Sequence, residues 1–180
     1  FLLFLYCSEA TPQDAEHLKR ELKSSNITNR AALLNSLSEA LMSDSLEESL
    51  YYSQQATMEA LNQKDAYQEA RSYHLQGKAN AALNRKDFAV FYLEKCVGIS
   101  RTHPFDSLGI YAILELAGFF MDINLDSTLY YSNRAIEWAE TNEAPEILLD
   151  VYNLAGLTYF RRGELNHALI HWNQALEKAK

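Results

Sequence analysis

Two histidines four residues apart, His167 and His171, have the clearest capacity for chemistry in this 180-residue chain. Imidazoles at positions i and i+4 share one face of a helix, and that spacing can hold a divalent metal such as zinc. A metal site needs further ligands, and no cysteine or carboxylate obviously completes this set. We therefore expect an exposed pair and no metal. A metal-dependent enzyme that uses His167 and His171 is a remote alternative.

His74 and Lys78 form a second pair with the same spacing, a histidine that can act as a base beside a cation. An ordinary surface pair is the simpler interpretation. The sequence also has no phosphate-binding glycine loop, no G-x-S-x-G, no H-E-x-x-H and no C-x-x-C. We expect no catalytic residue, no cofactor and no enzymatic activity.

The charge of the chain argues against nucleic acid as a partner. There are 24 acidic and 16 basic residues, which give a net charge of −8, whereas a nucleic-acid backbone requires clustered lysine and arginine. No basic residue occurs between Arg30 and Lys64 or between Arg101 and Arg134. These acidic stretches are solvated helix faces or, alternatively, a patch that selects a basic partner.

A pattern that returns about every forty residues organises the chain. A series of small residues lies at intervals of 40, 39 and 40 positions: Ala56, Cys96, Ala135 and Ala175. A second series lies about nineteen residues upstream: Leu37, Gly77, Gly118 and Gly156. Such periodicity is typical of stacked helical repeats, which form recognition surfaces more often than active sites. Cys96 stands where the other repeats have alanine, so we expect a small buried side chain, unconnected to Cys7.

Helical periodicity extends from residue 12 to the end, and no stretch alternates with the period of a strand. We expect one repeat domain over 11–180, with a first helix over 12–24 and Asp126 as a later N-cap. Four helix pairs should follow that first helix, at about 28–63, 65–103, 105–142 and 145–180.

The first ten residues have a different composition. Phe1 to Cys7 are continuously apolar, and Ser8-Glu9-Ala10 follows as the small-x-small end of a secretory signal peptide does. We expect a signal-peptide remnant, and therefore a protein exported to the periplasm of a bacterium. The alternative is an apolar turn packed on the first helix of a cytoplasmic protein. The run is too short to span a membrane, and no other segment is a candidate span.

The fourth helix pair resembles the tetratricopeptide repeat in residue type and spacing. The matching residues are Tyr152, Ala155, Gly156, Tyr159, Gly163, Ala168, Trp172 and Ala175. The second pair follows the same scheme, while the third and first match in part. Small residues such as Gly156 let two helices approach closely, large ones such as Trp172 fill the space beside them, and Gly163 permits the tight turn.

The resemblance implies an all-α fold, a right-handed superhelix of about four repeat-like helix pairs with an extra N-terminal helix. It also implies a non-enzymatic protein- or peptide-binding scaffold. Segments such as residues 126–131 resemble the N-terminal repeat region of bacterial tetratricopeptide sensor and regulator proteins, which implies a role in signal transduction within a larger protein. The pattern runs uncapped to Lys180, so we expect further chain beyond both ends. The alternatives are a cytoplasmic peptide-sensing regulator and a structural array that self-associates through its open ends.

In this family the first helix of each pair lines a groove that takes a peptide. Carried onto this sequence, the groove positions are Asn35, Ser38, His74, Lys78, Glu115, Phe119, Asn153 and Leu157. The clamp by which some family members hold a C-terminal carboxylate does not match, because Leu34 and Ser38 stand where its first lysine and asparagine are expected. The resemblance therefore implies a peptide partner of another kind.

Overall fold

The computed structural model describes residues 12–23, 29–103, 106–142 and 144–179, which form helices joined by turns and contain no strand. The predicted signal-peptide remnant and Cys7 lie outside these ranges. Within them, no helix is both long and apolar enough to be a membrane span. The chain divides into two compact units, one up to Ile99 and the other from Ser100 onward.

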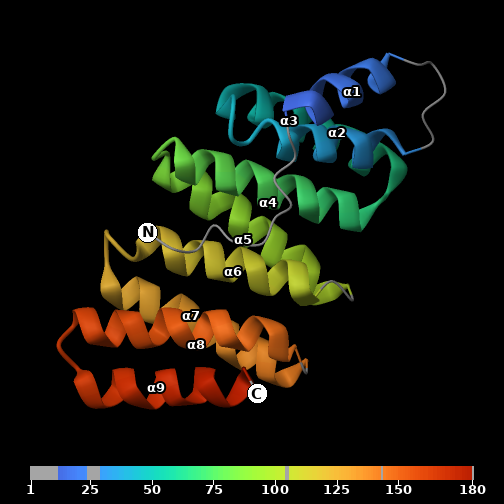
Figure 1. The fold of residues 1–180 in the computed structure, drawn as a ribbon. Helices are drawn as coiled ribbons and strands as arrows, with labels where there is room; N and C mark the ends of the chain where they lie inside the picture. Colours follow the sequence, from blue (N-terminus) through green and yellow to red (C-terminus); the bar gives the residue numbers. More distant parts are fainter. Residues whose placement is uncertain (1–11, 24–28, 104–105, 143, 180) are drawn as a thin grey trace. The chain divides into compact units, whose positions relative to one another are not determined.

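The first unit contains two helix pairs preceded by a single helix (Figure 1). Its helices are α1 (Pro12–Leu22), α2 (Arg30–Ala40), α3 (Leu46–Gln63), α4 (Ala66–Ala82) and α5 (Lys86–Thr102), whose last residues belong to the second unit. Helix α2 pairs with α3, and α3 also packs along α4. The first helix ends two residues before the expected position.

The second unit contains two further pairs. Its helices are α6 (Asp106–Phe120), α7 (Leu125–Thr141), α8 (Pro145–Arg161) and α9 (Leu165–Lys178). Helix α6 pairs with α7 and α8 with α9, while α7 packs against α8 and α6 also contacts α8. The first helices of the two pairs, α6 and α8, are therefore neighbours on one side of α7.

Polar side chains cap the N-termini of several of these helices. The side chain of Asp65 accepts a hydrogen bond from the backbone N–H of Gln68 (3.0 Å) at the start of α4. At α7 the cap is Asn124, which accepts from the N–H of Ser127 (3.0 Å), and the prediction of Asp126 as N-cap is wrong. Asp126 lies inside the first turn, where its charge still favours the positive end of the helix.

The forty-residue series lies in the core. Ala56, Cys96 and Ala135 have no exposed surface and Ala175 is 2% exposed, so the expectation of a small buried side chain at Cys96 is confirmed. These residues have side chains short enough to let neighbouring helices pack closely. Leu37, which replaces glycine in the first pair, is itself fully buried.

Two glycines of the second series are true points of close approach. A Cβ atom on Gly77 would lie 2.5 Å from Cγ of Leu93, and one on Gly156 would lie 2.6 Å from the ring of Trp172. Gly118 differs, because nothing lies within 4 Å of a Cβ placed there, so the third pair keeps the spacing of the series without the close approach.

The N-terminal helix covers one end of the first unit. Ala15 of α1 is buried together with Leu37, Ala40 and Leu41, and further apolar side chains of α1 pack against this cluster. An ion pair at 3.0 Å joins Lys19 of α1 to Glu48 of α3. Glu48 raises the pKa of Lys19 by accepting its hydrogen bond. The helix thus protects apolar surface of the first pair from water.

Replacing Gly77 by alanine should destabilise the protein by about 1–3 kcal/mol, because the new methyl group would overlap the fully buried Leu93. Gly118→Ala is the matched control in a helix with open space at the site. It should be neutral or stabilising by up to about 1 kcal/mol, the gain in helix propensity. Urea unfolding of both variants measures the difference, and equal midpoints would contradict the assigned close approach at Gly77.

Candidate binding surfaces

The groove positions predicted on α2 lie in the interior of the first unit. Asn35 and Ser38 have no exposed surface. The Asn35 amide donates to the backbone oxygen and to Oε1 of Gln68, both at 3.0 Å, and the Ser38 hydroxyl lies 2.9 Å from the backbone oxygen of Ser49. These hydrogen bonds hold α2 to α4 and α3. Neither side chain contributes to an accessible surface in this structure.

Helix α4 carries a stripe of basic side chains, the α4 stripe, formed by Arg71, His74 and Lys78. All three are partly exposed and follow one another at helical spacing. Arg71 donates a hydrogen bond at 2.7 Å to the carboxylate of Glu39 on α2, which fixes the direction of its guanidinium group. The stripe combines the predicted groove positions His74 and Lys78 with Arg71, which was not among those positions.

His74 is electrostatically unusual within the α4 stripe. Its Nε2 atom is enclosed and has no hydrogen-bond partner among the described residues. Burial, assisted by the positive charges of Lys78 and Arg71, lowers the pKa of His74 from 6.5 to about 3. The ring is therefore neutral at physiological pH, and it cannot share the positive charge of its two neighbours.

The second unit has a different surface, formed by the exposed stripes of α6 and α8. We name it the α6–α8 surface, and its residues are Tyr111, Glu115, Phe119, Asn153, Leu157 and Phe160. On α6 most positions are buried, whereas Tyr111 is exposed and Glu115 and Phe119 are partly exposed. The stripes are the part left exposed on two helices that both pack against α7. All four groove positions predicted in this unit belong to the surface.

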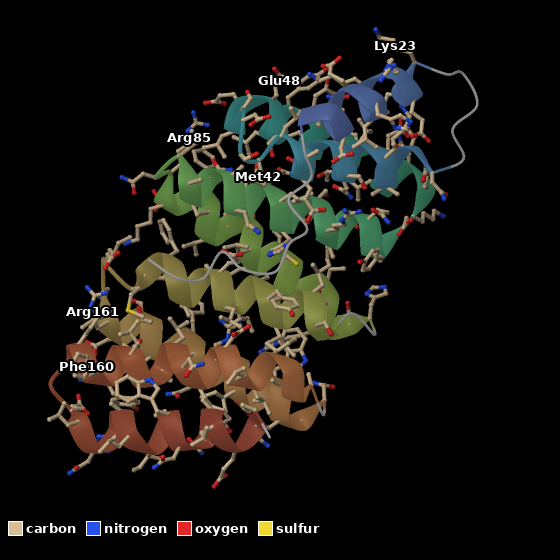
Figure 2. All side chains as sticks on the ribbon, in the orientation of Figure 1. Lys23, Met42, Glu48, Arg85, Phe160 and Arg161 are labelled. Atoms are coloured by element: carbon tan, nitrogen blue, oxygen red, sulfur yellow. The ribbon has the colours of Figure 1, made fainter. Side chains whose placement is uncertain are left out.

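The α6–α8 surface is held in place at one end. Figure 2 shows Phe160 and Arg161 beside each other at the end of α8. The guanidinium group of Arg161 donates hydrogen bonds to the backbone oxygen of Met121 (2.9 Å) and to the carboxylate of Asp122 (2.7 Å), just beyond α6. This connection fixes the end of α8 relative to α6, so the two stripes have a defined register.

The histidine pair lies on α9, and its two members have different surroundings. His171 is partly buried, and its ring stacks on Tyr159 with centroids 5.2 Å apart. Burial lowers the pKa of His171, with a smaller contribution from His167. His167 is exposed and lies 3.2 Å from the carboxylate of Glu164. Among the described residues, no group of three or more metal-ligating side chains converges here or elsewhere.

Tyr111 and Phe160 are exposed aromatic residues that the sequence analysis did not include in the groove. Their spacing offered a signal, because Tyr111 precedes Glu115 by four residues and Phe160 follows Leu157 by three. Both therefore continue the stripes already predicted on α6 and α8. The predicted groove positions therefore covered only part of the exposed stripe on each of these two helices.

Comparisons with known proteins agree with this architecture. A family model described as "Tetratricopeptide repeat" matches residues 70–103, the greater part of α4 and all of α5. A solved structure titled "Crystal structure of MamA" is similar at a TM-score of 0.67 and 18% sequence identity, over 92% of this chain and 86% of that chain. This similarity concerns the fold, and with the all-helical architecture it confirms the predicted α–α superhelix class. A search of curated proteins finds no match.

The neutral state of His74 predicts a pH dependence of stability. Because its pKa is about 3 in the folded chain and 6.5 when unfolded, the unfolded state binds more protons between these values. Stability should therefore fall as the pH decreases from 6.5 toward 3. At pH 4.5, two units below the pKa of the unfolded state, this loss amounts to about 3 kcal/mol, which His74→Gln should remove.

Urea unfolding of wild type and His74→Gln between pH 7 and pH 4.5 measures this contribution as a difference. His17→Gln, at an exposed position of α1, is the control and should keep the wild-type dependence. Identical pH profiles for wild type and His74→Gln would show that the enclosed ring does not titrate as described.

Proposed function

We propose that the chain, which matches the tetratricopeptide repeat over residues 70–103, is a non-enzymatic scaffold that binds a partner protein on its α6–α8 surface. One observation carries the proposal. Tyr111, Leu157 and Phe160 leave 44%, 43% and 52% of their surface exposed on two neighbouring helices whose other faces are packed. Exposed apolar side chains on adjacent helices are typical of a binding surface.

The composition of the surface defines the partner. Burial of apolar area on binding is favourable by about 25 cal/mol per Å², and aromatic residues such as Tyr111 and Phe160 are common binding anchors. Glu115 and Asn153 lie among them and can accept or donate hydrogen bonds that set the register of a bound segment. We infer a peptide segment, extended or helical, with spaced apolar side chains and a basic or amide group opposite Glu115.

The narrower parts of the sequence interpretation remain predictions. Signal transduction, a bacterial origin and export rest on the resemblance of residues 126–131 to sensor proteins and on the composition of residues 1–10. We retain them as hypotheses about the larger setting in which the scaffold operates. The binding surface does not depend on them.

Introducing a charge into the centre of the α6–α8 surface should abolish peptide binding without unfolding the chain. Peptides selected from a random library against the wild-type chain supply the probe. Leu157→Glu should weaken their binding at least tenfold, because it removes an apolar anchor and places a charge where the peptide would bury an apolar side chain. Fluorescence anisotropy with a labelled peptide measures the affinity.

Ile170→Glu supplies the matched control. Ile170 is an exposed aliphatic residue of the same unit, on α9 rather than on a first helix, with 54% of its surface accessible. This variant should bind the selected peptide as the wild type does. Equal losses in Leu157→Glu and Ile170→Glu, or none in either, would place peptide binding elsewhere and reject the proposal.

A further inference from the structure

Helix α9 carries an apolar stripe that lies outside the surfaces described above. Leu165, Leu169 and Leu176 leave 56%, 56% and 59% of their surface exposed, and the partly exposed Trp172 lies between the last two. Intervals of four, three and four residues separate these side chains. That spacing places all four on one face of the helix and is typical of a coiled-coil seam. We name this face the α9 stripe.

Contacts with α8 keep the stripe on the outside of the second unit. Among the described helices of this unit, α9 packs against α8 and against no other (Figure 1). Ala168 and Ala175 form its inner side, with 0% and 2% of their surface exposed. The ring of Trp172 lies so close to Gly156 that a Cβ atom there would be 2.6 Å from Cδ1 of the indole. Rotation of α9 to bury the stripe would break these contacts.

The α9 stripe lies on a segment that has no acidic side chain, lysine or arginine. These residue types are absent from Leu165 to Leu176, although the chain as a whole has a net charge of −8. Two copies of an acidic chain repel one another over most of their surface, and an uncharged face is where they can approach. A different partner protein is usually selected by charges beside the seam, and this helix has none there. The face therefore suits a second copy of this chain.

We propose that the α9 stripe binds the same stripe of a second copy of the chain, with the two helices antiparallel. In this arrangement Leu165 faces the partner's Leu176 and Leu169 faces the partner's Trp172. Each contact then occurs twice about a two-fold axis. Because both copies use their stripe in one contact, the assembly closes as a dimer and does not extend into an open array.

The residues beside the seam favour the antiparallel direction. On one side they are Asn166 and Asn173, and on the other Ala168 and Ala175. Antiparallel helices place Asn166 beside the partner's Asn173, and carboxamide groups can bond to one another because they carry both donors and acceptors. Parallel helices would instead place each asparagine beside an alanine, whose side chain offers no hydrogen bond.

The size of the face sets the strength of the dimer. With 14 residues, α9 is about 21 Å long and about 10 Å wide. The contact is therefore smaller than the roughly 800 Å² that each partner buries in a standard interface. Small interfaces are typical of weak complexes, so we expect a reversible dimer that forms at high protein concentration.

Sedimentation equilibrium of the full chain over about a hundredfold range of concentration tests the proposal. The average mass should rise from that of one copy to that of two and no further. Leu169→Glu should weaken the association at least tenfold, because it places a charge at the centre of the apolar contact. Ile170→Glu is the matched control, since Ile170 is 54% exposed but lies on another face of the same helix, and it should associate as the wild type does.

A wild-type chain that stays monomeric over this range, or that grows beyond two copies, would overturn the proposal. So would equal effects of Leu169→Glu and Ile170→Glu, because the stripe would then have no special role. Circular dichroism should show the wild-type helix content for both variants, since both positions are exposed.

Disulfide formation tests the antiparallel direction, in a Cys7→Ser background that leaves only the buried Cys96. A mixture of the Leu165→Cys and Leu176→Cys chains should form a covalent dimer on oxidation. Neither chain alone should do so, because its two new thiols would lie about 16 Å apart along the helix axis. Covalent dimers of each chain alone, with none added in the mixture, would show a parallel contact and overturn the proposal.

The dimer and the scaffold function can fail separately. Leu169 is not part of the α6–α8 surface, so Leu169→Glu should still bind the peptides selected for that surface. Loss of peptide binding in this variant, at concentrations where the wild type is monomeric, would make the α9 stripe a peptide site and overturn the dimer. Retained peptide binding together with lost association would support it.

Discussion

The distance between the two helices of each pair constrains the rest of this structure, and side-chain size at a few positions sets that distance. Gly77 admits Leu93, and Gly156 admits Trp172, at separations that a Cβ atom would prohibit. On the second helix of each pair, the small buried residues Ala56, Cys96, Ala135 and Ala175 also allow close packing. Once the pairs are this close, most faces of the first helices are buried, and only narrow stripes remain exposed for recognition.

The two units use their first helices differently because their buried contacts differ. In the first unit, Asn35 and Ser38 turn inward and form hydrogen bonds, so the accessible residues are the basic ones of the α4 stripe. In the second unit, buried aliphatic residues fill α6 and leave aromatic and acidic side chains outside. The same repeat framework therefore presents a polar surface in one unit, with the cations Arg71 and Lys78 and the ion-paired Glu39, and a largely apolar surface in the other.

Periodicity was sufficient to predict the helices, their pairing and the buried small residues, because these depend on local pattern and on one recurring contact. The surroundings of individual side chains could not be predicted as well from the sequence. Gly118 has the right spacing but no close neighbour, whereas Gly109, outside the series, makes room for Trp138. An open hollow beside Trp138 is lined by Arg101 and Arg134, which lie 33 positions apart in different helices. Its contacts depend on where Trp138 inserts, which no repeat pattern specifies.

Buried polar groups add specificity to the contact between helix pairs in the first unit. The hydroxyl groups of Thr57 and Ser72 lie 2.7 Å apart, and the amide of Gln76 donates to the hydroxyl of Thr57 at 2.8 Å. An apolar contact tolerates sliding, but a one-turn slip of α4 along α3 would separate the buried amide of Gln76 from the oxygen atoms of Ser53 and Thr57. The cost of leaving that amide without a partner is about 1–3 kcal/mol. The hydrogen bonds thus define the register that apolar packing alone leaves open, and with it the position of the α4 stripe.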